Sequence, residues 1–252
     1  MSANSFLLRF RVLLVAVRYT ICEIGDFARF VARPRRARGK PSTRKQRVNR
    51  VVFFTLAWFM VSLPLAAIFN AIEEAAGIHY MTPRLPRNVL VGVLVIGALG
   101  PVIEELVYRA GLRSPMFCLI LVPVVAVATV APTMTGAAIT VCTAVVLWAL
   151  AVAARRRAAL SASARSRMAK EFIRGYPKIF HLNCYLFAIA HASTYQFAGM
   201  QASLIFILVF PLAIGAAVMG YLRLRDGLAS SIMVHCLYNM AGISLILLAT
   251  QT

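Results

Sequence analysis

Long apolar runs alternate with short charged segments along most of the chain. A run of about 20 apolar residues is long enough to cross the roughly 30 Å hydrocarbon core of a bilayer as a helix. We therefore expect an all-α fold, a polytopic transmembrane helix bundle with about seven spans. The predicted spans are 51–72, 88–111, 116–130, 135–154, 179–198, 201–222 and 227–249.

The N-terminal region differs from these runs. Residues 5–31 are mostly apolar but interrupted by charges, which favours an interfacial amphipathic helix over a span. These charged residues are Arg9, Arg11, Arg18, Glu23, Asp26 and Arg29. Residues 33–50 are rich in Lys and Arg and contain Pro34, Gly39 and Pro41, which predicts a flexible cytoplasmic basic loop that attracts anionic lipid heads. The predicted division is therefore 1–50, amphipathic helix and basic loop, and 51–252, transmembrane domain.

The charge is strongly positive: 27 Lys and Arg stand against 8 Asp and Glu, a formal net charge of +19. These charges form blocks between apolar runs, including a second basic loop at 155–178 and a short inner turn at 223–226. This is the distribution of cytoplasmic loops in an integral membrane protein, so we expect lipids and not nucleic acid as partners. The five cysteines are scattered without a C-x-x-C pair, which indicates neither a disulfide framework nor a thiolate metal site.

Two adjacent carboxylates, Glu104 and Glu105, lie at the end of a long apolar run. A charge inside a spanning helix costs about 2.5–3.5 kcal/mol on insertion scales, so such residues face the protein interior or water. Glu105 and Arg109 are four residues apart and share one helical face, which predicts an ion pair. Glu104 is turned by about 100° and has no such partner, so we look for chemistry there.

Further polar residues interrupt two other predicted spans: His191 in one, and His235 and Asn239 in the last. At 1.5 Å per residue from the inner ends, Glu104 lies about 14 Å deep and His191 about 18 Å deep. His235 and Asn239 lie roughly 12 to 18 Å deep by the same count. Three segments therefore bring their polar groups to one level in the cytoplasmic half of the membrane.

Hydrolysis by activated water is the chemistry that these side chains favour. A desolvated glutamate becomes a competent base near neutral pH. Histidine and asparagine can donate to a developing oxyanion. Glu104, His191 and His235 could instead hold a divalent metal such as zinc with its activating water. A metal site and a metal-free glutamate mechanism both stay open.

Other classes of protease find no support in the sequence. It contains no H-E-x-x-H motif and no G-x-S-x-G motif, which disfavours a helical zinc protease and a serine elbow. No pair of intramembrane aspartates exists, since Asp226 stands alone, which disfavours an aspartyl dyad.

With these residues the chain resembles the CPBP family of intramembrane proteases, also called the ABI or type II CAAX prenyl endopeptidase family. The family motif E-E-x-x-x-R matches Glu104, Glu105 and Arg109, and F-x-x-x-H matches Phe187 and His191. The third motif, H-x-x-x-N, matches His235 and Asn239. The motifs occur in the family's order over residues 51–249, so the resemblance implies a CPBP-type protease domain at 51–252. The basic N-terminal region lies outside it.

The resemblance also implies roles. Glu104 would activate the water, and His191 would help with positioning or protonation. His235 and Asn239 would stabilise the oxyanion. Glu105 and Arg109 would hold the helix in place. Eukaryotic members remove the last three residues of prenylated CAAX proteins, and bacterial members are linked to peptide processing, bacteriocin self-immunity and protein maturation. The family is commonly described as metalloproteases, although a metal-free mechanism has been argued for it.

The expected activity is therefore intramembrane endopeptidase cleavage of a peptide or of a protein C-terminus, with prenylation left open. The expected location is the bacterial inner (plasma) membrane, with the active site toward the cytoplasm. One alternative is a non-catalytic membrane scaffold or bacteriocin-immunity-type protein that keeps the motif residues for structure. Another is a small transporter with Glu104 and the histidines as a proton relay, which the absence of an internal repeat disfavours.

Overall fold

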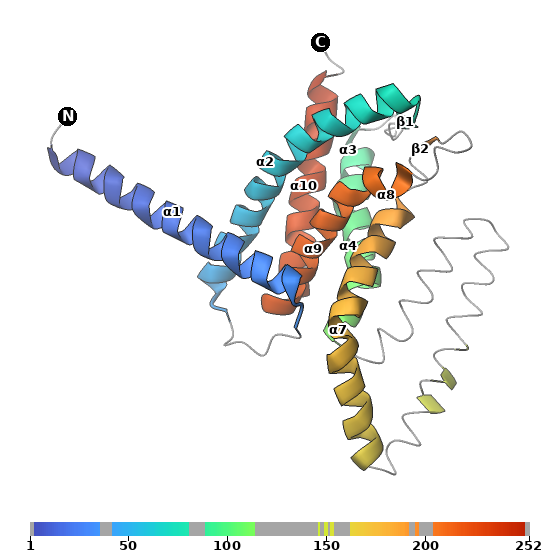
Figure 1. Cartoon of the computed structure of the whole chain (residues 1–252). Coiled ribbons are helices and arrows are strands. Elements are labelled where there is room, and N and C mark those ends of the chain that lie inside the picture. The colour runs from blue at the N-terminus through green and yellow to red at the C-terminus, as the bar shows by residue number, and fades with distance from the viewer. Residues whose placement is uncertain are drawn as a thin grey trace.

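The structure is a computed structural model that describes residues 3–35, 42–80, 89–113, 146, 149–150, 152–153, 162–191, 195–196 and 204–249. Almost all of these residues are helical, and the strands β1 and β2 are two residues long and pair antiparallel. Figure 1 shows the helices gathered around α9, with the first half of α1 extending away from the bundle. In chain order the elements are α1 Ala3–Ala32, α2 Arg44–Ala76, β1 His79–Tyr80, α3 Val89–Gly92, the π-helix η1 Val93–Leu99, α4 Gly100–Arg109, the 3₁₀-helix η2 Ala110–Arg113, α7 Ala162–Ala190, β2 Tyr195–Gln196, α8 Ile205–Leu208, α9 Phe210–Arg225 and α10 Leu228–Ala249.

Three helical stretches within the described residues are long and apolar enough to cross a membrane: 44–76, 90–113 and 228–247. They coincide with the spans predicted at 51–72, 88–111 and 227–249, and helices of this length and apolarity indicate a membrane protein. The spans predicted at 116–130 and 135–154 lie outside the described residues, apart from five positions between 146 and 153.

The prediction of a basic loop at 155–178 is wrong from residue 162 onward, because α7 begins at Ala162. Its first turns contain Ala, Arg, Lys, Met and Glu, which are strong helix formers. Phe172, Tyr176 and Phe180 then follow at intervals of four residues and are all buried, so tertiary contacts hold this face of the helix. Within the span predicted at 179–198, α7 ends at Ala190 and Tyr195–Gln196 form β2, while residues 192–194 and 197–198 lie outside the described residues.

The prediction of a flexible loop at 33–50 is wrong from Arg44 onward. The side chain of Thr43 accepts a hydrogen bond of 3.3 Å from the backbone N–H of Gln46. The side chain of Gln46 accepts one of 2.9 Å from the N–H of Thr43. This capping box satisfies two otherwise unpaired donors and begins α2 at residue 44.

The region predicted as one span at 201–222 and an inner turn at 223–226 is divided differently. The short α8 ends at a turn around Val209, and α9 then continues through Arg225. The turn into α10 comes at Asp226 and Gly227, where Gly227 has φ 113°. Side chains disfavour that backbone region, so glycine is suited to this sharp reversal.

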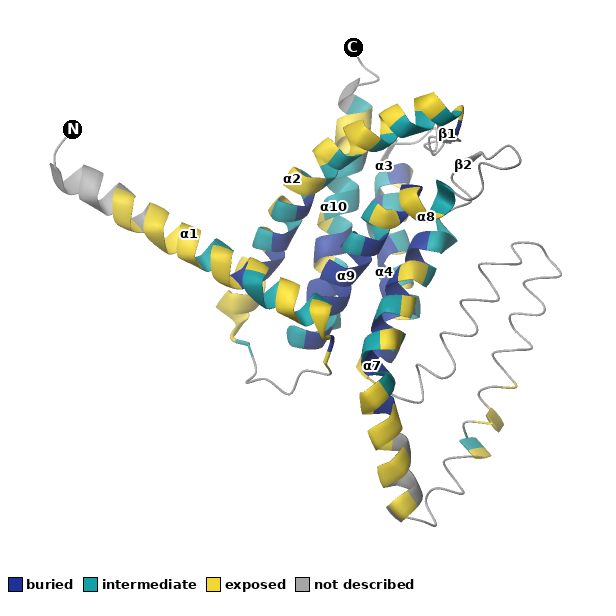
Figure 2. Cartoon of the chain, in the orientation of Figure 1, coloured by how far each residue is buried: buried dark blue, intermediate teal, exposed yellow. Residues whose placement is uncertain are grey.

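Helix α9 is the centre of the core, as the dark blue ribbon in Figure 2 shows. Its residues 215–222 are all buried, and α7, α10, α1 and α2 all contact it. Helix α7 packs tightly against α9 at Gly220, where an added Cβ would lie 2.6 Å from Cε2 of Phe180. Phe180 is itself fully buried. The absence of a side chain at Gly220 therefore sets how near α7 lies to α9.

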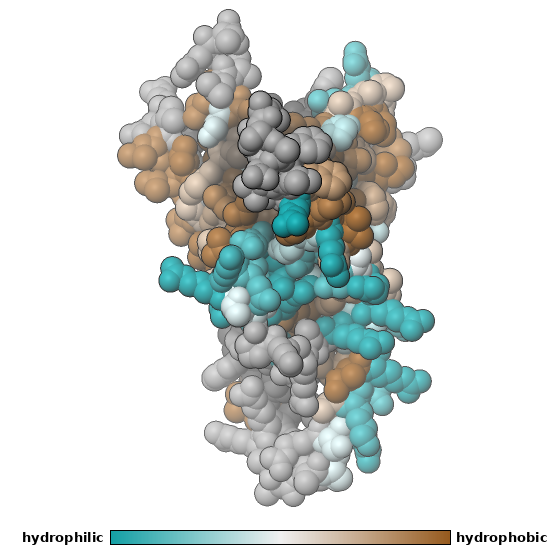
Figure 3. Space-filling view, turned by 90° about the vertical axis from the view of Figure 1, so that its left-hand side faces the viewer, coloured by the Kyte–Doolittle hydropathy of each residue, from teal (hydrophilic) through white to brown (hydrophobic). Residues whose placement is uncertain are grey.

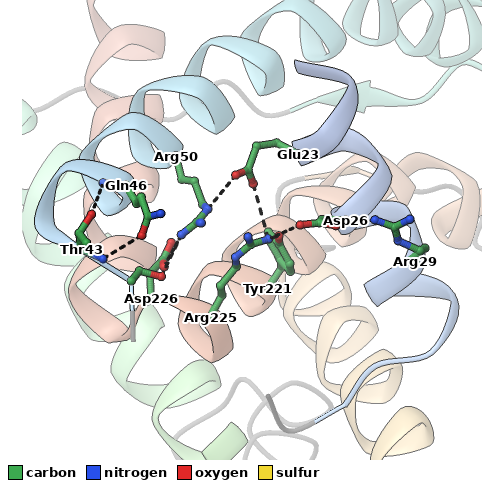
Figure 4. Close-up of polar contacts among 10 residues, drawn as sticks. Glu23, Asp26, Arg29, Thr43, Gln46, Arg50, Tyr221, Arg225 and Asp226 are labelled. Atoms are coloured by element: carbon green, nitrogen blue, oxygen red, sulfur yellow. Dashed lines mark hydrogen bonds and ion pairs between the residues drawn. The ribbon is translucent and has the colours of Figure 1, made fainter. Parts of the chain in front are cut away.

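A buried ion network ties α1 and α2 to the α9–α10 turn (Figure 4). Arg50 of α2 contacts Glu23 of α1 through Nε and Oε1 at 3.0 Å, and Asp226 through Nη1 and Oδ1 at 2.7 Å. Arg225 contacts Asp26 of α1 at 2.9 Å. Burial raises the pKa of Asp26, but its hydrogen bonds with Arg29 and Arg225 outweigh this and lower the pKa below its usual range. Arg50 is thus a structural residue at the start of α2, rather than part of a solvated loop.

We predict that Gly220→Ala lowers the free energy of unfolding by about 1–3 kcal/mol, because the methyl group overlaps the Phe180 ring in a packed core. Thermal unfolding in detergent, followed by circular dichroism, measures this loss. Gly242→Ala in α10 is the matched control, because its Cβ meets nothing within 4 Å. That control should be neutral or slightly stabilising. Equal loss in both variants would contradict this packing.

Candidate active site

The helix that carries the two glutamates is preceded by a π-helix, η1. Gly100 at its end donates to the carbonyl of Val95, five residues earlier. π-Helical turns interrupt regular bonding and occur often at functional sites. The side chain of Asn239 in α10 donates through Nδ2 to the carbonyl of Ile96 at 3.2 Å. Helix α10 therefore holds η1, and with it the start of α4, in position.

Glu105 is fully buried, and its partners come from two helices. Arg109, one turn later in α4, places Nε 3.6 Å from Glu105 Oε1. His235 of α10 places Nδ1 3.1 Å from the same oxygen, and the hydroxyl of Ser231 contacts Oε2. The contact between Arg109 and Glu105 confirms their predicted pairing.

Glu104 lies in a different environment, with 32% of its side chain exposed. Its Oε2 is 3.8 Å from Nε2 of His191 and 3.7 Å from Nε2 of His235. The three residues come from α4, from the turn at the end of α7, and from α10. The structure thus brings together the carboxylate and two imidazoles that the sequence placed at one depth.

The hydrogen bonds at the other ring nitrogens indicate how the two histidines are protonated. Nδ1 of His191 lies 2.8 Å from the carbonyl oxygen of Phe187, which can only accept. Nδ1 of His235 lies 3.1 Å from Glu105, which also accepts when ionised. In the neutral form each ring therefore carries its proton on Nδ1, and Nε2 faces Glu104 with a lone pair.

Phe187 connects the two histidines with the buried arginine. Its ring centroid is 4.7 Å from that of His191 and 5.9 Å from that of His235. The guanidinium carbon of Arg109 lies 4.2 Å from the same centroid. Tyr108 packs edge-on against Phe187 at 5.2 Å. Phe187, predicted as a supporting residue, thus contacts the groups on both sides of the site.

The role that the resemblance implies for Asn239 is only partly compatible with this geometry. One donor of its amide is used on Ile96. An amide group has two N–H donors, so the second is left for an oxyanion. The same role for His235 requires the imidazolium, because neutral His235 offers only a lone pair at Nε2.

Two functional contacts escaped the sequence analysis. Ser231 lies one helical turn before His235, and that spacing on one face was the available signal. Arg223 was expected to be a topology charge in an inner turn. Instead its Nε donates to the backbone carbonyl of Arg109 at 3.0 Å, which ties α9 to the end of α4.

The predicted metal site can be compared with this arrangement. Over the part of the chain that the structure describes, no group of three or more His, Cys, Asp and Glu side chains is arranged to hold a metal ion. Glu104, His191 and His235 are among the described residues and form no such group. The zinc alternative stays a prediction.

Comparison with protein-family models, with curated proteins and with solved structures finds no match to this chain. The three motifs and the contacts among their residues are therefore the features of this chain that bear on its function.

We predict unequal effects on stability from substitution of the two adjacent glutamates. Glu105→Gln should lower the free energy of unfolding by about 3 kcal/mol, because it leaves the buried Arg109 without its counter-charge. Glu104→Gln should change it by less than about 0.5 kcal/mol, since this side chain is partly exposed and holds no helix in place. Unfolding in mixed detergent measures both, and equal losses would contradict the division of roles.

Proposed function

We propose that this chain is an intramembrane endopeptidase that hydrolyses a peptide bond with water activated by Glu104. One observation carries the proposal: Glu104 Oε2 lies within 3.8 Å of imidazole nitrogens from two other helices. The order and spacing of the three motifs support it as a resemblance. The buried partners of Glu105 support it as well, because they leave Glu104 as the carboxylate free to act as a base.

In the proposed first step, a water molecule donates hydrogen bonds to Glu104 Oε2 and to Nε2 of one histidine. The Oε2–Nε2 separations of 3.7–3.8 Å are too long for direct hydrogen bonds, and the buried Oε2 has no hydrogen-bond partner among the described residues. Glu104 takes one proton as the water oxygen attacks the carbonyl carbon of the substrate. The neutral Nε2 of His191 or His235 orients the water through its other proton.

The tetrahedral intermediate carries a negative oxygen, and the second N–H of Asn239 is the proposed donor to it. The proton held by Glu104 then passes to the nitrogen of the leaving amine as the C–N bond breaks. The products are a carboxylic acid and an amine, and Glu104 returns to its ionised form. His191, with 31% of its side chain exposed, lies on the more accessible side of the site.

The proposed setting is a bundle of about seven spans in a bacterial inner membrane, with the site toward the cytoplasm. Figure 3 shows hydrophobic surface over the upper part of one face and hydrophilic side chains gathered below it. Arg50, Arg113 and Arg225 share one end of the bundle, since Arg50 contacts Asp226 and Arg113 donates to Leu224. The positive-inside rule makes that end the proposed cytoplasmic one. The proposed substrate is a peptide or a protein C-terminus, with or without a prenyl group.

We also propose that α1 is an interfacial amphipathic helix. Successive residues of a helix are turned by about 100°, which places Tyr19, Phe27 and Phe30 on one side of α1, facing the bundle. Their rings pack edge-on or tilted against aromatic rings of α2, α7 and α9. The opposite side bears an exposed apolar stripe, and arginines line one edge between the two. An apolar stripe flanked by arginine is the pattern of a helix lying in the headgroup region. The stripe consists of Phe10, Leu14, Val17, Ile21 and Ile24, and the arginines are Arg11, Arg18 and Arg29.

We predict that spin labels on α1 report two environments in lipid vesicles. A label at Leu14→Cys should be more accessible to oxygen, which partitions into lipid, because it lies on the apolar stripe. A label at Arg18→Cys should be more accessible to a water-soluble nickel reagent. Electron paramagnetic resonance saturation measures both in a background without the native cysteines. Equal accessibility at both sites would contradict an interfacial placement.

We predict that Glu104→Gln abolishes peptide cleavage and that His191→Ala lowers kcat at least 100-fold, because base and water orientation are lost. Cleavage of a peptide library by purified protein in detergent, followed by mass spectrometry, measures this. His181→Ala, a change to another histidine of α7, is the matched control and should retain activity. Cleavage retained by Glu104→Gln would overturn the proposal. Folded wild type that cleaves nothing would favour a scaffold or immunity role.

A further inference from the structure

Ser231 is a fully buried residue of α10 that no catalytic role above uses. Its hydroxyl lies between two oxygens of other helices: Glu105 Oε2 in α4, and the carbonyl of Met219 in α9 at 3.0 Å. Both oxygens are acceptors for the hydroxyl proton, and the ionised carboxylate of Glu105 is the stronger acceptor of the two. Ser231 thereby joins three helices at the buried carboxylate.

This is not the usual behaviour of a serine in an apolar helix. Such hydroxyls commonly donate to a carbonyl one turn earlier in their own helix. Ser244 of α10 does so, with a hydrogen bond of 2.9 Å to Met240. Ser231 instead points out of its helix, toward Glu105. The direction of the side chain therefore needs a reason other than local hydrogen bonding.

Ser231 and His235 are one helical turn apart, and they contact the two different oxygens of Glu105. The hydroxyl contacts Oε2, and Nδ1 of His235 lies 3.1 Å from Oε1. With Oε2 occupied in this way, the carboxylate cannot turn without losing a buried hydrogen bond. A buried acceptor without its donor costs about 1–3 kcal/mol. The pair thus directs one oxygen of Glu105 at the histidine ring.

We propose that Ser231 is a positioning residue that, through Glu105, keeps the proton of neutral His235 on Nδ1 and its lone pair at Nε2 facing Glu104. The orientation of His235 follows from buried contacts alone. Its use in orienting the attacking water rests on the proposed function. His235 is accordingly an acceptor toward the water rather than a neutral donor to the oxyanion.

The test is nitrogen NMR of protein labelled with ¹⁵N-histidine in detergent micelles, at a pH where His235 is neutral. The chemical shifts of the two ring nitrogens distinguish the Nδ1–H form from the Nε2–H form. The chain has four histidines, and His235→Gln identifies the signals of His235. Wild type should show His235 predominantly as the Nδ1–H form. Wild-type His235 in the Nε2–H form would overturn the inference without any further variant.

Ser231→Ala should raise the Nε2–H fraction of His235 at least several-fold, because the carboxylate is then held at one oxygen only. Ser230→Ala is the matched control: it removes the hydroxyl of the adjacent buried serine, and it should leave the spectrum of His235 unchanged. Ser231→Thr keeps a hydroxyl and should restore the wild-type spectrum. A spectrum of Ser231→Ala identical to wild type, or a change of equal size in Ser230→Ala, would overturn the positioning role.

Cleavage measurements separate this inference from the proposed function. If wild type cleaves a peptide, Ser231→Ala should lower kcat by up to about tenfold with little change in KM, as expected for the loss of one hydrogen bond. If wild type cleaves nothing, the proposed function fails while the NMR result on His235 still stands. If cleavage is present and the His235 spectrum is insensitive to Ser231, this inference alone fails.

Discussion

The contact on which the rest of the site depends is that between the buried carboxylate of Glu105 and its partners. A carboxylate with no exposed surface must be compensated by charge and hydrogen bonds, or the helix that carries it will not pack. Arg109 supplies the charge from α4 itself, and His235 and Ser231 supply the other contacts from α10. Because these partners are directional, they set the rotation of α4 against α10.

That rotation explains why the neighbouring glutamate is suited to chemistry. Glu104 is turned by about 100° from Glu105, so it leaves the buried cluster and reaches the partly exposed side of α4. There it faces Nε2 of His235, whose Nδ1 is already engaged, and Nε2 of His191 from the end of α7. Close packing of α7 on α9 at Gly220 brings the end of α7, and His191 directly after it, near Glu104. One glutamate thus orders the helices, and the other is left for reaction.

The parts that were predictable from sequence depend on spacing within one helix or on depth along several. Four-residue separation predicted the pairing of Glu105 with Arg109, and equal depth predicted that Glu104 and the histidines would meet. Contacts between distant segments were not predictable in this way. Arg50 was taken for a loop residue because its partners, Glu23 and Asp226, lie 27 and 176 residues away. Asn239 donates to the carbonyl of Ile96 within the π-helix η1, and neither the apolar sequence of η1 nor its periodicity predicts that hydrogen bond.

The central claim is that Glu104 meets both histidines across three helices, and cysteine cross-linking tests it most directly. In a background without the five native cysteines, Glu104→Cys is combined with His191→Cys or with His235→Cys and treated with a short bifunctional thiol reagent. Both pairs should cross-link within one chain. Glu104→Cys with His181→Cys should not, because residue 181 lies ten positions, about 15 Å, back along α7. Failure of both site pairs, or equal cross-linking of the His181 pair, would contradict the account.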